Sequence, residues 1–134
     1  MSKKSLHFII NPISGTGKQE NITSKIEKTI DSSVFESHIH FTERKGHATE
    51  IAKDLRSDNA DLIIAVGGDG TVNEIAQSLV NSSTTLGIIP TGSGNGLARH
   101  LGIPQNITKA LRLINTLNCR KIDSCTANTN FFMN

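Results

Sequence analysis

The sequence of 134 residues contains neither tryptophan nor tyrosine, and five phenylalanines are its only large aromatic side chains. Proteins that bind single-stranded nucleic acid usually stack bases on aromatic rings, so this composition argues against such a function. The charges point the same way. Fourteen Lys and Arg against twelve Asp and Glu leave a formal net charge of +2, and the cations are scattered along the chain. We therefore expect no nucleic-acid partner.

Long apolar runs and clusters of metal-binding residues are also missing. No segment is long enough to span a bilayer or to form a signal peptide, so we expect a cytoplasmic protein. Cys119 and Cys125 are the only cysteines, and neither has Cys or His neighbours at the spacing of a zinc site. A reducing compartment would keep both as thiols. The length fits one domain with an ordinary core.

The most informative segment is a glycine-rich stretch between a predicted strand and a predicted helix. Residues 62–66, Leu-Ile-Ile-Ala-Val, are typical of a strand buried on both faces, and residues 72–80 carry apolar residues at helical spacing. Between them lies Gly-Gly-Asp-Gly-Thr at 67–71. Ligands of open α/β sheets bind at such strand ends, and the amides at a helix start favour phosphate. We expect the glycines to permit positive φ and close approach of a ligand.

Two widespread phosphate loops do not fit this chain. A Walker A loop needs Gly-Lys-Ser/Thr, but Gly17 and Lys18 are followed by Gln19, and Pro12 stands where the first glycine belongs. The dinucleotide fingerprint G-x-G-x-x-G fails at each of its three candidate starts. Asp69 is the unusual residue of the central segment. A carboxylate repels phosphate unless a metal ion or a donor group lies between them.

Residues 67–71 resemble the GGDGT motif of phosphofructokinases, NAD kinases and diacylglycerol kinases. Two other segments narrow this resemblance. Asn-Pro-Ile-Ser-Gly at 11–15 follows the first predicted strand, and Pro-Thr-Gly-Ser-Gly-Asn at 90–95 follows the fourth. In this order, along nearly the whole chain, the three segments are similar to the catalytic domain of the diacylglycerol and sphingosine lipid kinase family. The resemblance implies a three-layer α/β/α, Rossmann-like domain with a parallel sheet.

Apolar periodicity predicts strands and helices that alternate up to residue 117, which favours parallel strands joined by right-handed crossovers. The expected strands lie at 6–10, 34–41, 62–66 and 86–89, and the expected helices at 19–30, from 46, at 72–80, 97–101 and 106–117. Two more strands are expected at 121–127 and 131–133, separated by a turn at 128–130. The apolar end at 131–133 indicates a piece of a longer protein. By resemblance, residues 121–134 would begin a second, β-rich domain.

Three backbone amides, of Gly68, Gly70 and Thr71, are our choice of phosphate ligands from the residues alone. The Thr71 hydroxyl could add a donor or cap the helix. Asp69 is the candidate catalytic residue. It could hold Mg²⁺ directly or through water, or it could orient the acceptor hydroxyl; the alternative is a turn former with an Asx-type bond.

The family resemblance implies a larger ATP site. Its residues would be Asn11, Pro12, Ser14, Gly15, Thr42, Gly67, Gly68, Asp69, Gly70, Thr71, Asn73, Glu74, Gly92, Ser93 and Asn95. We expect Asn73 and Glu74 in the first helical turn, where Glu74 could simply complement the helix dipole. Arg99 could neutralise phosphate or face solvent. His38 and His40 share one face of a predicted strand, but the sequence shows no third zinc ligand, so we interpret them as exposed or satisfied.

The function implied by the resemblance is phosphorylation of a lipid hydroxyl, with ATP and Mg²⁺ as cofactors and a diacylglycerol-like or sphingoid lipid as the partner substrate. An NAD kinase is an alternative enzyme, and a non-catalytic nucleotide-binding module is an alternative of another class. Family members carry the general base in a C-terminal domain. We therefore expect this chain to fold without transferring phosphate, and any peripheral membrane contact to depend on the missing domain. A homodimer is left open.

Overall fold

The structure is a computed structural model that describes residues 3–12, 22–90, 107–115, 119–123 and 128–132. Its elements are, in chain order, β1 (Lys4–Ile10), α1 (Ile22–Thr29), β2 (Phe35–Phe41), α2 (His47–Ser57), β3 (Leu62–Gly67), α3 (Asp69–Ser78), β4 (Thr85–Pro90), α5 (Ile107–Ile114), β5 (Cys119–Asp123) and β6 (Asn128–Phe132). In the described part of the chain, no helix is long and apolar enough to cross a membrane.

All of the described strands belong to one sheet, in the order β2-β1-β3-β4-β6-β5. The strands β2, β1, β3 and β4 are parallel to one another, as predicted. A helix follows each of β1, β2 and β3 and returns the chain to the end of the sheet where the strands begin. β6 pairs in parallel with β4, and β5 pairs antiparallel with β6. All six residues of β3 are buried, so this strand forms the centre of the fold.

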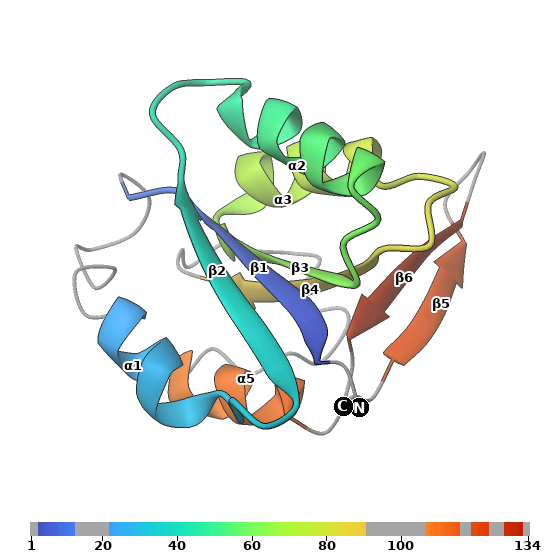
Figure 1. The fold of residues 1–134 in the computed structure, drawn as a ribbon. Helices are drawn as coiled ribbons and strands as arrows, with labels where there is room; N and C mark the ends of the chain where they lie inside the picture. Colours follow the sequence, from blue (N-terminus) through green and yellow to red (C-terminus); the bar gives the residue numbers. More distant parts are fainter. Residues whose placement is uncertain (1–2, 13–21, 91–106, 116–118, 124–127, 133–134) are drawn as a thin grey trace.

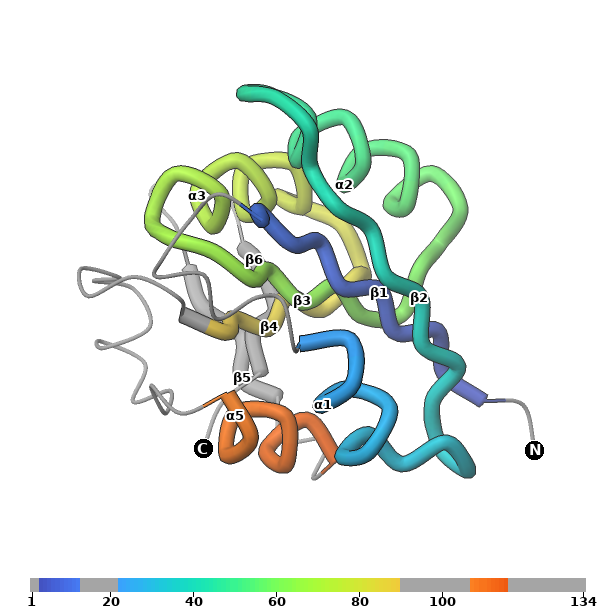
Figure 2. The backbone as a smooth tube through the Cα atoms, turned by 90° about the vertical axis from the view of Figure 1, so that its left-hand side faces the viewer, coloured from blue at the N-terminus to red at the C-terminus, as the bar shows by residue number. Residues whose placement is uncertain are grey.

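Helices cover both faces of the sheet, which confirms the predicted three-layer α/β/α architecture (Figures 1 and 2). α2 and α3 pack on one face, and α1 and α5 pack on the other. Successive residues of a strand point to opposite faces, so the central strands supply both cores. Ile63 and Ala65 join the cluster beneath α2 and α3, whereas Ile64 and Val66 join the cluster with α1 and α5.

The C-terminal strands differ from the expected pattern. The turn predicted at residues 128–130 is wrong, because Asn128–Phe132 forms β6. Pairing with β4 on one side and β5 on the other satisfies the backbone polar groups of this segment and overrides the local turn preference of asparagine. β5 begins at Cys119, two residues before the predicted strand. Both strands extend the first sheet, and a second domain starting at residue 121 stays a prediction.

Candidate functional site

The carboxyl ends of three neighbouring strands are joined by backbone hydrogen bonds. The N–H of Asn11, just after β1, donates to the carbonyl of Val66 in β3 at 3.0 Å. The N–H of Thr42, just after β2, donates to the carbonyl of Ile10 at 2.9 Å. The carboxyl ends of β1, β2 and β3 are therefore held together at one edge of the sheet by its hydrogen-bonding network.

α3 begins directly at the end of β3. Asp69 is its first residue, Gly68 is its N-cap, and the first helical bond runs from the N–H of Val72 to the carbonyl of Gly68. The amides of a first helical turn have no partner within the helix, and a glycine cap offers no side chain to accept from them. Asp69 is exposed at this helix start. Amides and a carboxylate thus lie at the edge where parallel sheets bind ligands.

The glycines of this segment do not take the positive φ that we expected. Gly68 has φ −87° and ψ −170°, because the chain passes from strand to helix through extended backbone. Their lack of a side chain matters in another way. A Cβ on Gly67 would lie 3.0 Å from the Cβ and Oγ1 of Thr71, whereas a Cβ on Gly68 or Gly70 would meet nothing within 4 Å. Gly67 permits close packing, and the other two leave open space in front of the helix start.

Thr71 and Asn11 come together from elements 60 residues apart. The side-chain amide of Asn11 donates to Oγ1 of Thr71 at 3.4 Å, and the threonine is 8% exposed. Thr71 is the third residue of α3, so the alternative role of helix N-cap is wrong; Gly68 occupies that position. The contact connects two of the predicted segments through their side chains.

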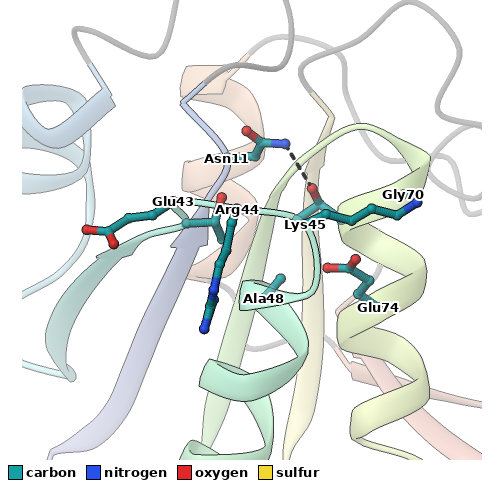
Figure 3. Close-up of a pocket in the computed structure, with 9 residues that line it drawn as sticks. Asn11, Glu43, Arg44, Lys45, Ala48, Gly70 and Glu74 are labelled. Atoms are coloured by element: carbon teal, nitrogen blue, oxygen red, sulfur yellow. Dashed lines mark hydrogen bonds between the residues drawn. The ribbon is translucent and has the colours of Figure 1, made fainter.

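A pocket of about 410 Å³ opens at this edge (Figure 3). It brings together five residues of the predicted ATP site: Asn11, Thr42, Gly70, Thr71 and Glu74. Only the family resemblance suggested Thr42 as a site residue, and the structure places it in the pocket lining at 8% exposure. Four further lining residues were not predicted: Glu43, Arg44, Lys45 and Ala48.

The two cations of the β2–α2 loop were missed because the charged residues looked evenly scattered. Lys45 extends toward the start of α3, beside Gly70, while Glu43 points away from it (Figure 3). Arg44 forms an ion pair with Glu50 of α2. Their position in the sequence could have revealed them, because Arg44 and Lys45 lie between the strand-end residue Thr42 and the start of the next helix. Lys45 thus places a positive charge on the wall of the pocket.

Glu74 has a different position from the one predicted. It is the sixth residue of α3, beyond the first turn, and Asn73 before it is exposed. The placement of Asn73 and Glu74 in the first helical turn is therefore wrong, and so is the alternative role of Glu74 as a complement to the dipole of its own helix. Its Oε1 instead accepts a hydrogen bond from the N–H of Gly46, at 3.2 Å. Gly46 is the N-cap of α2, so the carboxylate complements the positive end of the neighbouring helix.

Part of the predicted site lies outside the described residues: Ser14, Gly15, Gly92, Ser93 and Asn95, together with Arg99 and the helical segment 97–101. Pro12 is described and exposed. Across the described ranges, no group of three or more His, Cys, Asp or Glu residues is arranged to hold a metal ion. A nucleotide-bound Mg²⁺ ion needs only one or two carboxylates, since phosphate oxygens and water complete its shell. The exposed carboxylate of Asp69 at the start of α3 fits that requirement.

Comparisons with known proteins agree with this architecture. Residues 5–127 match the family described as the diacylglycerol kinase catalytic domain, so the chain belongs to that family. It is 37% identical to the diacylglycerol kinase of Bacillus subtilis strain 168 over 134 residues, covering 98% of this chain and 44% of that protein. The corresponding protein of Staphylococcus saprophyticus is 31% identical, with the same two coverages.

A solved structure supports the fold independently. The crystal structure of a diacylglycerol kinase from Bacillus anthracis str. Sterne superimposes with a TM-score of 0.75 at 36% identity, covering 90% of this chain and 44% of that one. The chain thus spans less than half the length of the relatives that it matches.

Proposed function

We propose that this chain is the nucleotide-binding part of a lipid kinase that transfers the terminal phosphate of ATP to a lipid hydroxyl. One observation carries the proposal: the pocket unites Asn11, Thr42 and the first turn of α3 at the carboxyl edge of a parallel sheet. Family membership supplies the reaction class, and the names of the relatives support diacylglycerol as the acceptor. A sphingoid base is the alternative acceptor.

The chain's own groups would bind and orient the phosphates. Amides of Gly70 and Thr71 would donate to phosphate oxygens, and Gly68 and Gly70 leave room for that approach. Lys45 would neutralise phosphate charge from the opposite wall. Phosphoryl transfer depends mainly on such positioning and neutralisation. When bound, Mg²⁺ would neutralise further charge on the nucleotide, with Asp69 as its ligand, directly or through water.

The other predicted residues have supporting roles in this proposal. Asn11 would fix the Thr71 hydroxyl, whose Oγ1 it contacts. Glu74 would hold the β2–α2 loop through its bond to Gly46 and thereby place Lys45. Thr42 would form part of the pocket wall, and Gly67 would let Thr71 pack closely beneath it. Pro12 and Asn73 are exposed and do not line the pocket, so contact with the nucleotide stays a prediction for them. The general base would lie outside this chain, so the chain alone would bind ATP without phosphorylating lipid. A cytoplasmic location and membrane contact through the remaining part of the protein belong to the same proposal.

The proposal is tested by calorimetric titration of Mg-ATP, and of ATP with EDTA, into four proteins. They are the unmodified chain, Asp69→Asn, Lys45→Gln and the control Lys53→Gln, whose lysine is exposed on α2. We expect binding that needs metal, a loss of at least tenfold in the first two variants, and no change in the control. Equal affinity in all four proteins would contradict the assignment of the pocket.

The two alternative functions are separated by activity of the full-length protein. Phosphorylation of NAD but not of lipid would favour an NAD kinase, which the family match argues against. Full cellular activity of an Asp69→Asn variant would favour a non-catalytic module. Phosphorylation of diacylglycerol vesicles that is lost in Asp69→Asn would support the kinase.

A further inference from the structure

Three histidines form a cluster that lies apart from the nucleotide pocket. His7 is in β1, and His38 and His40 are in the edge strand β2. The register pairs His7 with His38, and His40 lies two residues further along the same face. The sequence showed the pair in β2 but not the third histidine, because only the register of β1 against β2 brings His7 beside them. None of the three lines the pocket at the glycine-rich segment.

Two ring nitrogens of this cluster point at each other. Nδ1 of His7 lies 3.0 Å from Nε2 of His40. A tetrahedral Zn²⁺ ion with bonds of about 2.05 Å holds two nitrogen ligands about 3.3 Å apart. Two adjacent nitrogens of a square-planar Cu²⁺ or Ni²⁺ complex lie about 2.8 Å apart. The observed separation falls between these values. Because the two nitrogens face each other directly, with ring centroids 5.3 Å apart, each ring must also turn by about 35° before both lone pairs meet at one tetrahedral ion.

We propose that His7 and His40 form a two-histidine chelate for a divalent transition-metal ion such as Zn²⁺, Ni²⁺ or Cu²⁺, with water completing the coordination. Imidazole nitrogens suit these ions, whereas Mg²⁺ prefers oxygen ligands. The site is therefore chemically distinct from any metal bound with nucleotide. The ion would join edge strand β2 to β1.

His38 orients the chelate without binding the ion. Its ring stacks on that of His7, with centroids 4.6 Å apart and planes 14° apart. Its own Nε2 lies 3.1 Å from Oε1 of Glu36. The stacking contact orients the His7 ring, and the contact with Glu36 orients His38 itself. The site thus has two ligands and one positioning residue.

Each ring binds a metal ion through a ring nitrogen that carries no proton. Without metal, one facing nitrogen carries the proton of their hydrogen bond. When an ion binds, that proton leaves the facing nitrogen, and the same ring gains one from water at its other nitrogen, so no net proton is released.

Titration of NiCl₂ or ZnCl₂ into the chain tests the proposal, with Cys119 and Cys125 replaced by serine so that thiols do not compete. We expect one ion per chain, and at least tenfold weaker binding in His7→Gln and in His40→Gln. His38→Gln should lose less than threefold. The matched control His47→Gln should bind as the parent does, because Nδ1 of His47 accepts the N–H of Glu43 outside the cluster.

Two further measurements test the proposal even if some of the variants fold poorly. The melting temperature of the parent should rise with Ni²⁺ concentration, and that of folded His40→Gln should not. In ¹⁵N spectra of histidine side chains, Zn²⁺ should shift Nδ1 of His7 and Nε2 of His40 in the parent itself. Undiminished binding by His40→Gln, no saturable binding, or shifts confined to other histidines would overturn the proposal.

Discussion

The carboxylate of Glu74 in α3 accepts a hydrogen bond from the backbone N–H of Gly46, the residue that caps α2. This contact crosses between the two helices on one face of the sheet and fixes the loop that carries Arg44 and Lys45. A side chain predicted as a nucleotide ligand is thus also a structural link between two walls of the pocket.

Replacing Glu74 with alanine should lower the free energy of unfolding by about 1–2 kcal/mol, because it removes a charge-assisted hydrogen bond and a favourable helix-dipole interaction. Urea denaturation measures the change. The control Glu27→Ala, on the exposed side of α1, should change stability by less than about 0.5 kcal/mol. Equal effects of the two substitutions would contradict a linking role for Glu74.

Gly46 should tolerate asparagine better than alanine. Its φ of 86° lies in the left-handed region, and a Cβ there would meet nothing within 4 Å, so the penalty is conformational and not steric. Gly46→Ala should therefore lower stability by about 1–2 kcal/mol. Gly46→Asn should lower it by less, because asparagine enters this region more readily. Thermal unfolding of the two variants decides the order, and a more stable alanine variant would refute it.

Gly67 and Gly70 should respond in opposite ways to alanine. At Gly67 the new Cβ would press on Thr71, so Gly67→Ala should lower stability by about 1–3 kcal/mol. At Gly70, inside α3, alanine meets open space and should raise stability by about 0.5–1 kcal/mol. The same Gly70→Ala should weaken ATP binding, since the methyl group would occupy space proposed for phosphate. Calorimetry and urea unfolding of each variant separate the two effects.

Mild acid should destabilise the fold through His7. Burial, followed by repulsion from His38 and His40, lowers the pKa of His7 from 6.5 to about 4 in the folded protein, so the unfolded chain binds protons first as the pH falls. The contribution of neutral His7 is therefore complete above about pH 6.5 and is lost between there and pH 4. Unfolding midpoints measured with EDTA should fall over this range, and His7→Gln should flatten the slope. An unchanged slope in that variant would contradict the prediction.

Much of the fold could be predicted from the sequence because local patterns and burial agree there. The apolar run of β3 and the stripe of α3 predict a buried strand followed by a helix, and the structure has both. Parallel pairing also follows from the alternation of strands and helices. Convergence of Asn11, Thr42 and Thr71 could be expected because the carboxyl ends of parallel strands share one edge.

The remaining features depend on contacts between distant segments. The direction of Lys45 and the bond from Gly46 to Glu74 arise from how α2 packs beside α3, which leaves no periodic signal. His7 meets His40 through strand register alone. β6 begins with residues that favour turns, and only its two neighbouring strands make it extended. The turn preference of these residues was overruled because β4 and β5 supply hydrogen bonds to the backbone of β6.

The position of β6 has a consequence for the order of folding. Among the described strands, β5 pairs only with β6, which follows it in the chain and lies between it and β4. Of the described strands, none can receive β5 as the chain emerges from the ribosome, and none covers this edge of β4 until β6 has been made. Such edges template association with other chains. Pairing of β6 with β4 removes this template, so β6 protects the nascent chain from association at that edge.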